Sequence, residues 1–260
     1  MTNAVSAARN GQILEITLDR PKANAIDAAT SQALSAKFVE FRDDPELRVA
    51  ILTGAGERFF TAGWDLNAAS EGEEFESDYG PGGFGGFGEL EGLNKPVILA
   101  VNGMAVGGGF EMTMAADLVV AAEHAQFFLP ETGVGIIPDV GTIRLPKLLP
   151  HPIAMEVLIG GRRLTSHEAM RWGLVNDVVP GNELMEAARA MANRIIAGAP
   201  LAVGAIIDLI KRTRHLSVED GLALMRSGDV ELYEAMLTSE DAREGPQSFV
   251  EKRPPHWEGR

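Results

Sequence analysis

A cluster of glycines followed by a carboxylate is the first feature of this chain that could do chemistry. Gly107, Gly108 and Gly109 follow an apolar run, and Glu111 comes two residues later in a segment predicted to be helical. Glycines let a ligand approach the backbone closely, and the unpaired N–H groups at a helix start favour a developing oxyanion. The stretch therefore indicates a donor cradle beside a proton carrier. A tight turn with a glutamate at the positive end of a helix dipole is the alternative.

A second carboxylate, Glu131, follows Pro130 at the next proline turn after these glycines. We predict one strand between Glu111 and Glu131, and we expect both side chains at the same end of a sheet. Two carboxylates in different environments can act as one proton donor and one acceptor near neutral pH. The turn at residues 62–64 could add another backbone N–H to this site. On its own, Glu131 would be a solvated turn residue.

The composition is that of an ordinary globular protein and excludes several kinds of site. The 260 residues are 45% hydrophobic and 23% charged, and no apolar run reaches the roughly 20 residues that cross a bilayer. The absence of cysteine excludes disulfides and zinc–thiolate sites, and the histidines lack metal-ligand spacing. A net charge of −14 disfavours nucleic acid unless a local basic patch exists. Residues 1–12 do not resemble a signal peptide, so we expect a cytoplasmic enzyme.

Alternating strands and helices are expected to position these groups. Strands are predicted at residues 13–18, 49–53, 97–101 and 118–121, with a short one at 126–129. Asp27 is a good N-cap for a helix that ends near Pro45. A loop-to-helix entry at residues 61–66 and a helix at 110–116 complete this half of the chain. The alternation predicts an α/β core.

The pattern becomes helical from about residue 153. Thr165 and Glu168 form a capping box at the start of one helix. Further helices are predicted at residues 183–197 and, as two or three more, from residue 201 onward. We therefore divide the chain into an α/β core at residues 1–198 and a helical subdomain at residues 199–260.

Residues 71–92 differ from the rest of the chain in composition. Acidic residues come first, and the stretch from Tyr79 to Gly88 is rich in glycine and aromatic residues. This is too much glycine for a regular element and too many rings for an inert linker. A mobile lid fits the composition, and a disordered surface loop is the alternative.

Several motifs distributed along the chain match one enzyme family. They are ITLDRP near the N-terminus, FFTAGWDL at 59–66, KPVILAVNGMAVGGGFEMTMAADLVVA at 95–121, FFLPETGVGIIP at 127–138 and SEDAREGPQSFVEKRPP at 239–255. With them the chain resembles the enoyl-CoA hydratase/isomerase (crotonase) superfamily over nearly its whole length. RPKANAID, FRDDPELRVAILTGAGERF, YGPGGFGG and the ending W-x-G-R resemble, more narrowly, its carnitinyl-CoA dehydratase (crotonobetainyl-CoA hydratase) branch.

The resemblance implies a crotonase-like spiral of ββα units whose C-terminal helices assemble homotrimers or hexamers, the latter as dimers of trimers. It implies an acyl-CoA substrate, with coenzyme A as part of that substrate and with no separate cofactor, metal, nucleic acid or membrane partner. The implied activity is reversible hydration of a short α,β-unsaturated acyl-CoA, in this branch between carnitinyl-CoA and crotonobetainyl-CoA. A general short-chain enoyl-CoA hydratase, an enoyl-CoA isomerase and a non-catalytic acyl-CoA-binding protein are the alternatives.

The same resemblance implies roles for individual residues at matching positions. Glu111 and Glu131 would be the two catalytic glutamates, Glu111 deprotonating the water bound for C3 and Glu131 protonating C2. The backbone N–H groups of Trp64 and Gly108 would form the oxyanion hole. Residues expected to hold the substrate and its CoA moiety are Lys22, Ala23, Ala25, Ala62, Asp65, Leu66, Gly107 and Pro130.

Two positions depart from the pattern of the family. Hydratases of the family commonly have a small residue where Trp64 stands. The stretch at residues 138–142 is one residue shorter than the usual proline-to-GGT stretch of the family and contains a single glycine. A carnitinyl group carries a quaternary ammonium, which aromatic faces can recognise. The candidate rings are Trp64, Tyr79, Phe84 and Phe87. Alternatively, these rings only enclose an apolar acyl chain.

Overall fold

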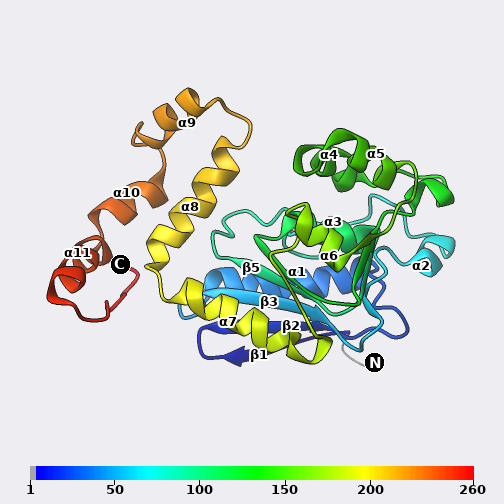
Figure 1. Cartoon of the computed structure of the whole chain (residues 1–260), viewed down its shortest axis with the longest axis horizontal. Coiled ribbons are helices and arrows are strands. Elements are labelled where there is room, and N and C mark those ends of the chain that lie inside the picture. Colours follow the sequence, from blue (N-terminus) through cyan, green and yellow to red (C-terminus); the bar gives the residue numbers. More distant parts are fainter. Residues whose placement is uncertain (1–3) are drawn as a thin grey trace. The chain divides into compact units, whose positions relative to one another are not determined.

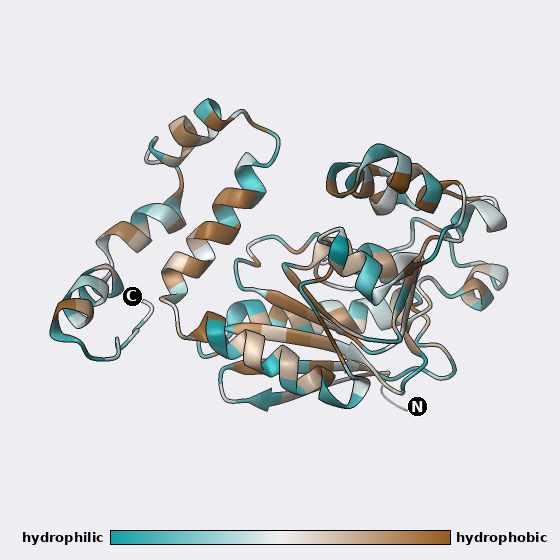
Figure 2. Cartoon of the chain, viewed as in Figure 1, coloured by the Kyte–Doolittle hydropathy of each residue, from teal (hydrophilic) through white to brown (hydrophobic). Residues whose placement is uncertain are grey.

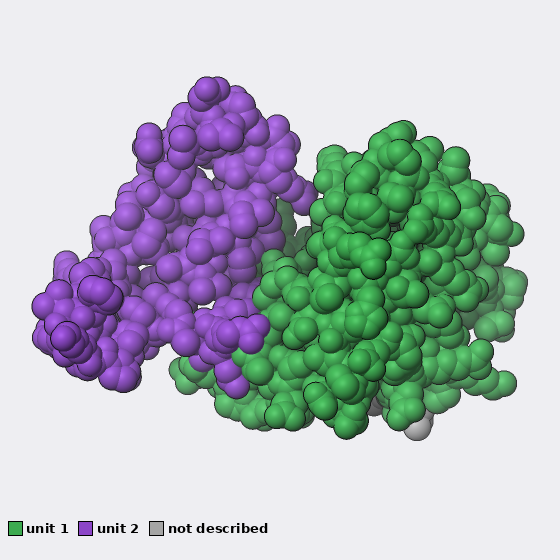
Figure 3. All heavy atoms as spheres, viewed as in Figure 1, with its two compact units in different colours: residues 1–93, 97–192 green, residues 94–96, 193–260 purple. Residues whose placement is uncertain are grey.

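The structure is a computed structural model that describes residues 4–260. The first three residues, including the start of the segment compared above with a signal peptide, lie outside the described residues. The chain divides into two compact units, one of residues 1–93 and 97–192 and the other of residues 94–96 and 193–260 (Figure 3). Each unit is described by itself below.

The first unit contains a six-stranded sheet with the order β1-β2-β3-β5-β7-β10 (Figure 1). Its strands are β1 (Val5–Asn10), β2 (Ile13–Leu18), β3 (Val49–Gly54), β5 (Val97–Val101), β7 (Leu118–Ala122) and β10 (Asp177–Val179). Only β1 and β2 pair antiparallel in this sheet. Every residue of β5 is buried, as expected for a parallel strand covered on both faces.

A second sheet of four strands has the order β4-β6-β8-β9. Its strands are β4 (Phe59–Thr61), β6 (Met104–Val106), β8 (Gln126–Phe128) and β9 (Leu164–Thr165). The consecutive pairs β3–β4, β5–β6 and β7–β8 each place one strand in each sheet, and each pair is followed by a helical turn. These turns are α2 (Leu66–Ser70), α3 (Gly108–Ala115) and the 3₁₀ helix η1 (Glu131–Val134). The predicted α/β class with repeating ββα units is therefore confirmed.

Helix α1 (Ala28–Asp43) covers the larger sheet and begins where the capping residue predicts. The Asp27 side chain accepts a hydrogen bond from the Thr30 amide at 2.8 Å, which satisfies a donor in the first helical turn. Leu34, Phe38 and Phe41 are fully buried. The α1 face that these three side chains form is thus part of the core, as their helical spacing indicates.

The predicted strands are confirmed, but several elements were missed or placed wrongly. Strand β6, directly before the glycines at 107–109, was not predicted, and α3 begins at Gly108, two residues before the predicted start. The strands predicted at residues 118–121 and 126–129 are β7 and β8, and both lie between Glu111 and Glu131, so the expectation of a single strand between the glutamates is wrong. Helices α4 (Asp139–Leu148) and α5 (His151–Leu158) begin before residue 153. The prolines of α5 sit in its cap and first turn, where helices tolerate them.

The remaining helices of the first unit follow their predicted signals. Helix α6 (Ser166–Arg171) begins at Thr165, whose hydroxyl accepts a hydrogen bond from the Glu168 amide at 3.2 Å. This is the hydrogen bond from the Glu168 amide to the Thr165 hydroxyl that the predicted capping box requires. Helix α7 (Leu184–Ile196) follows a short 3₁₀ turn, η2 (Gly181–Glu183), and contains the boundary of the two units.

The second unit is helical. It contains α8 (Pro200–Thr213), α9 (Val218–Met225), α10 (Glu231–Thr238) and α11 (Glu240–Glu251). The prediction of two or three helices is wrong because Ser217 and Ser239 each cap a new helix after a short turn. Apolar residues are concentrated on α8 in this unit and on the strands of the first unit (Figure 2).

Neither a membrane-spanning helix nor a metal-binding cluster is found among the described residues. Between residues 4 and 260 no single helix is long and apolar enough to cross a membrane, and only the bent pair of Gly181–Ile196 and Pro200–Thr213 passes that test together. Over the same range no group of three or more His, Cys, Asp or Glu side chains is arranged to hold a metal ion. The cytoplasmic location stays a prediction.

Candidate active site

A cavity in the first unit collects the predicted catalytic groups. It has a volume of about 600 Å³, and it is lined by Trp64, Gly108, Glu111 and Glu131. Among the predicted substrate-binding residues, Ala62, Leu66, Gly107 and Pro130 also line it. Lys22, Ala23, Ala25 and Asp65 do not belong to the lining. The two sequence turns and the two glutamates therefore meet at one hollow of the protein.

The backbone turn at Gly63 comes into contact with the start of α3. Gly63 has φ +77°, and a Cβ at this position would stand 2.8 Å from the Gly108 nitrogen. The neighbours of Trp64 are paired, since Ile26 N donates to Gly63 O and Asp65 N donates to Ile26 O. Within residues 4–260, the amides of Trp64 and Gly108 have no hydrogen-bond acceptor. Two free donors thus lie close together on the cavity wall.

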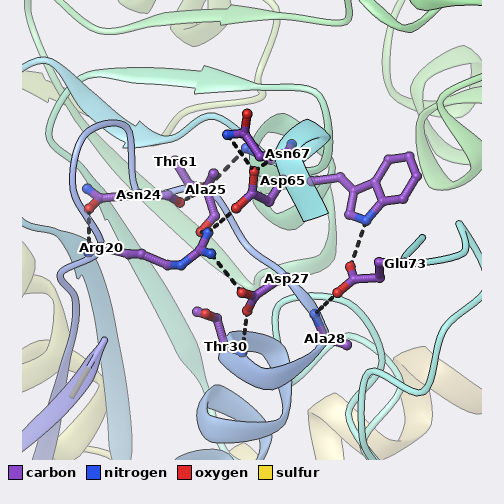
Figure 4. Close-up of polar contacts among 12 residues, drawn as sticks. Arg20, Asn24, Ala25, Asp27, Ala28, Thr30, Thr61, Asp65, Asn67 and Glu73 are labelled. Atoms are coloured by element: carbon purple, nitrogen blue, oxygen red, sulfur yellow. Dashed lines mark hydrogen bonds and ion pairs between the residues drawn. The ribbon is translucent and has the colours of Figure 1, made fainter. Parts of the chain in front are cut away.

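An ion-pair network lies behind this turn (Figure 4). Arg20 donates to Asp65 at 2.6 Å and to Asp27 at 2.7 Å, which joins the turn to the start of α1. Asp65 also caps α2 by accepting from the Asn67 amide at 2.9 Å. The Asp65 side chain is therefore engaged within the protein. Any contact of Asp65 with CoA would therefore be made by its backbone.

The strip that contains Lys22, Ala23 and Ala25 lies next to the cavity wall. Ala23 O accepts a hydrogen bond from the Ala62 amide at 2.9 Å, and Ala62 lines the cavity. Ala25 O accepts from Arg20 at 2.9 Å. Lys22 is exposed. These residues thus border the site at the edge formed by Ala62.

Glu111 lies in the first turn of α3 and is 9% exposed. Its Oε1 accepts a hydrogen bond from the Gly141 amide at 2.7 Å. Burial raises the pKa of Glu111 to about 8; the bond from Gly141 opposes the rise, and the charges of Asp139 and Glu131 add to it. At neutral pH this carboxyl group is therefore predominantly protonated.

Glu131 is the first residue of η1 and is 8% exposed. Its Oε1 lies against the backbone at Gly107, where a Cβ would stand 2.6 Å away. Its buried Oε2 has no hydrogen-bond partner in residues 4–260. Burial raises the pKa of Glu131, and the charge of Asp139 contributes in the same direction. A buried carboxyl oxygen without a partner in a cavity wall is suited to a substrate or water contact.

Two acids of this region, Asp139 and Glu73, were not predicted from the sequence. Asp139, the first residue of α4, lines the cavity, and its charge acts on both glutamates. It lies in the short 138–142 stretch that departs from the family pattern, which is the signal that could have found it. Glu73 accepts from the Trp64 indole at 2.9 Å and from the Ala28 amide at 3.0 Å (Figure 4). Nothing in the acidic run around Glu73 distinguishes it in the sequence.

The glycine-rich part of the loop at residues 71–92 is anchored to α1. Ser31 Oγ donates to Gly83 O at 3.0 Å, and the Gly82 amide donates to Ser35 Oγ at 3.0 Å. Phe87 is 5% exposed and belongs to the core, so its predicted contact with a substrate is wrong. A disordered loop is also wrong for this part. Aromatic residues that do line the cavity are Trp64, Phe75, Tyr79 and Phe84.

The sequence is similar to one family model and to curated relatives over nearly its whole length. The model of the family described as enoyl-CoA hydratase/isomerase matches residues 8–260. A carnitinyl-CoA dehydratase of Salmonella arizonae is 57% identical over 260 residues, covering all of both chains. A carnitinyl-CoA dehydratase of Salmonella typhi is 57% identical over 261 residues, again at full coverage.

Solved structures agree with this result. The crystal structure of an enoyl-CoA hydratase from Mycobacterium tuberculosis superposes with a TM-score of 0.89 at 38% identity, covering 99% of this chain and 100% of that one. The crystal structure of the enoyl-CoA hydratase from Bacillus anthracis has a TM-score of 0.89 at 35% identity, with the same coverage.

Proposed function

Because the chain belongs to the enoyl-CoA hydratase/isomerase family, we propose that it adds water to, and removes water from, an acyl-CoA thioester. The observation that carries the proposal is one cavity lined by two buried glutamates and by two residues whose backbone amides have no acceptor in residues 4–260. Coenzyme A enters as part of the substrate, and no other cofactor is proposed.

The amides of Trp64 and Gly108 would act on the thioester oxygen. Addition of water at C3 turns the thioester into an enolate, which places negative charge on that oxygen. Two preorganised N–H donors stabilise this charge, and losing one such donor typically costs about 3–4 kcal/mol of activation free energy. The oxyanion hole is proposed at this pair because neither amide has an acceptor among the described residues and both residues line the same cavity.

The glutamates would move the two protons of the reaction. In hydration Glu111 takes a proton from water while Glu131 gives one to C2, and in dehydration the roles reverse. The pair therefore carries one proton before and after the reaction in either direction. With a pKa of about 8, Glu111 holds that proton at neutral pH. This is the state that starts dehydration, because Glu111 can protonate the leaving hydroxyl group.

The specific reaction that we propose is the interconversion of carnitinyl-CoA and crotonobetainyl-CoA. Full-length relatives at 57% identity that are named carnitinyl-CoA dehydratase support this acyl group. A general short-chain enoyl-CoA hydratase is the second candidate, since solved structures with that name match at 35–38% identity. An isomerase needs a single carboxylate, so two buried glutamates in one cavity favour hydration. The same intact pair disfavours a non-catalytic acyl-CoA-binding protein.

The CoA moiety would lie along the strip beside Ala62. Its adenine and pantetheine are proposed to contact the backbone around Lys22, Ala23 and Ala25, because Ala23 is joined directly to the cavity-lining Ala62. Leu66, Gly107 and Pro130 line the same cavity and would contact the part nearest the thioester.

Association into homotrimers or hexamers is proposed through the helical unit. Within it Ile206, Ile210 and Phe249 are 58%, 60% and 84% exposed. Exposed apolar side chains of this size commonly mark a protein–protein interface. Light scattering of the purified protein tests the proposal, and a monomer across the accessible concentration range would contradict it.

The activity is tested with purified protein and two substrates, crotonobetainyl-CoA and crotonyl-CoA. Loss of the conjugated enoyl thioester absorbance reports hydration, and the hydrated product is identified by mass spectrometry. We expect turnover of both, with the higher kcat/KM for crotonobetainyl-CoA. Turnover of crotonyl-CoA alone would support the general hydratase instead, and a shifted double bond without added water would support the isomerase.

A further inference from the structure

The charged residues of the cavity lining are mostly acidic. Six lining residues are Asp or Glu, and Arg144 is the single basic one among the described residues of the lining. This charge repels the phosphates of CoA, so the acid-rich part is suited to the acyl end of the substrate. A cationic acyl group would gain from such a lining, whereas a neutral or anionic one would not.

Two perpendicular pairs of aromatic rings line the same cavity. Trp64 and Phe75 have ring centroids 5.4 Å apart at 79°, and Tyr79 and Phe84 have centroids 5.4 Å apart at 78°. Ring faces attract cations through their quadrupole, and they do so most strongly where water is excluded. An apolar acyl chain would also pack against these rings. The rings alone therefore do not identify the ligand.

Asp139 favours a cationic acyl group over an apolar acyl chain as the ligand of these rings. It lines the same cavity as Glu111, Glu131 and Tyr79, and its charge acts on all three. Among residues 4–260 it forms no ion pair; its Oδ1 accepts the Val140 amide at 2.7 Å, and its side chain is hydrogen-bonded to that of Glu111. The proposed chemistry uses two carboxylates. Asp139 is a third carboxylate beside them, and its charge makes both glutamates harder to ionise. This indicates a role for Asp139 outside the two proton transfers.

The second independent observation is the unpartnered Oε2 of Glu131. This oxygen is buried in a side chain that is 8% exposed, and it belongs to the wall of the same cavity. A ligand that reaches it places C2 and C3 beside the glutamates. A γ-ammonium nitrogen is then only two bonds from C3, which puts it next to the catalytic pair. Asp139 is the carboxylate at that place.

We propose that Asp139, together with the rings of Trp64 and Tyr79, forms a subsite for a quaternary ammonium group on the γ carbon of the acyl chain. The inference rests on the proposed hydro-lyase activity and assigns its substrate specificity to one residue. A quaternary ammonium has no N–H to donate, so a nearby negative charge and ring faces are the means of binding it. Arg144 does not neutralise the lining completely, since five acids besides the protonated Glu111 share the lining with it.

The test compares crotonobetainyl-CoA with its carbon isostere, in which a tert-butyl group replaces trimethylammonium. The two substrates have the same shape and differ in charge. We expect wild type to prefer the cationic substrate in kcat/KM, and Asp139→Asn to lower this preference about tenfold, mainly through KM. Tenfold corresponds to about 1.4 kcal/mol. Asp139→Glu should restore most of the preference, and Asp229→Asn, an exposed Asp of the helical unit, should leave it unchanged.

Each outcome decides between the proposals. If wild type turns over neither substrate, the proposed function itself fails. If it turns over both equally well, the function stands and the cation subsite is wrong, whether or not Asp139→Asn folds. If Asp139→Asn lowers kcat/KM for both substrates by the same factor, Asp139 does not determine specificity and the inference is overturned.

Discussion

Glu111 Oε1 accepts a hydrogen bond from the Gly141 amide at 2.7 Å. This bond joins α3, which carries the glutamate, to the first turn of α4, which also carries Asp139. The amide favours the ionised carboxylate, while burial and the charge of Asp139 favour the protonated one. One oxygen of Glu111 is thereby fixed in direction, and the Asp139 side chain is hydrogen-bonded to the same carboxyl group.

Replacement of either glutamate by glutamine is expected to lower kcat strongly. Glutamine keeps the size of the side chain but cannot transfer the proton, and general acid–base catalysis contributes roughly 10²–10⁴-fold per group. Glu111→Gln and Glu131→Gln should each lose activity in this range while product still binds, as measured by calorimetry. The matched control is Glu219→Gln on α9, an exposed glutamate of the other unit. Full activity in both cavity variants would rule out the two-glutamate mechanism.

The pH dependence of kcat/KM follows from the single proton that the pair must carry. Glu111 has a pKa of about 8, so the pair loses this proton as the pH rises above that value. We expect kcat/KM to fall above about pH 8 in both reaction directions, because the required proton number is the same in each. Rate measurements between pH 6 and about 10 test this.

Asp139→Asn should move that decline to lower pH. The charge of Asp139 raises the pKa of Glu111 and of Glu131, so its removal makes both easier to ionise. The shift is measured on the neutral isostere, whose binding does not depend on Asp139. A decline at unchanged or higher pH would contradict this electrostatic coupling.

Gly107 is expected to tolerate no side chain. Its φ is +54°, and an added Cβ would stand 2.6 Å from Glu131 Oε1. Gly107→Ala should therefore displace the glutamate and lower kcat at least about tenfold, together with a lower Tm from backbone strain. Gly133→Ala is the control, since a Cβ there meets no atom within 4 Å. Equal activity of the two variants would show that the close approach is not needed.

Signals that act between near neighbours could be predicted from the sequence. Asp27 and Thr165 cap helices through amides three residues away, so a short window of sequence contains the whole interaction. The meeting of Glu111 and Glu131 was anticipated from their turns, although two strands separate them. Helix caps of this kind depend little on the rest of the fold.

Features that depend on distant segments were missed. Strand β6 has three residues between glycines and becomes a strand only by pairing with β4 and β8. Asp139 acts on the glutamates because α4 packs against α3. Phe87 was assigned to the substrate, but Phe38 of α1 packs against it with ring centroids 5.0 Å apart. In each case tertiary contacts determine the structure or role of the residues, and local composition does not predict those contacts.

Arg20 is expected to stabilise both the fold and the Trp64 turn. Its guanidinium donates to Asp65, which is 7% exposed, and to Asp27 at the start of α1. Arg20→Met would leave a buried carboxylate without its cation, for which losses of about 3–5 kcal/mol are typical. Arg20 itself is 28% exposed, so we expect about 2–3 kcal/mol here after solvent screening. Urea unfolding measures the loss.

The pH dependence of this loss has a definite sign. Burial raises the pKa of Asp65, but the hydrogen bonds from Arg20 and Asn67 lower it overall below its ordinary value. The stabilisation is therefore present above the unfolded-state pKa of about 4 and is lost as the pH falls through the lower folded-state pKa. The difference in unfolding free energy between wild type and Arg20→Met should be largest at neutral pH and should shrink in acid. Arg9→Met, which removes an exposed pair with Asp44, is the matched control and should cost less than about 1 kcal/mol. Equal losses in the two variants would show that burial of Asp65 does not matter.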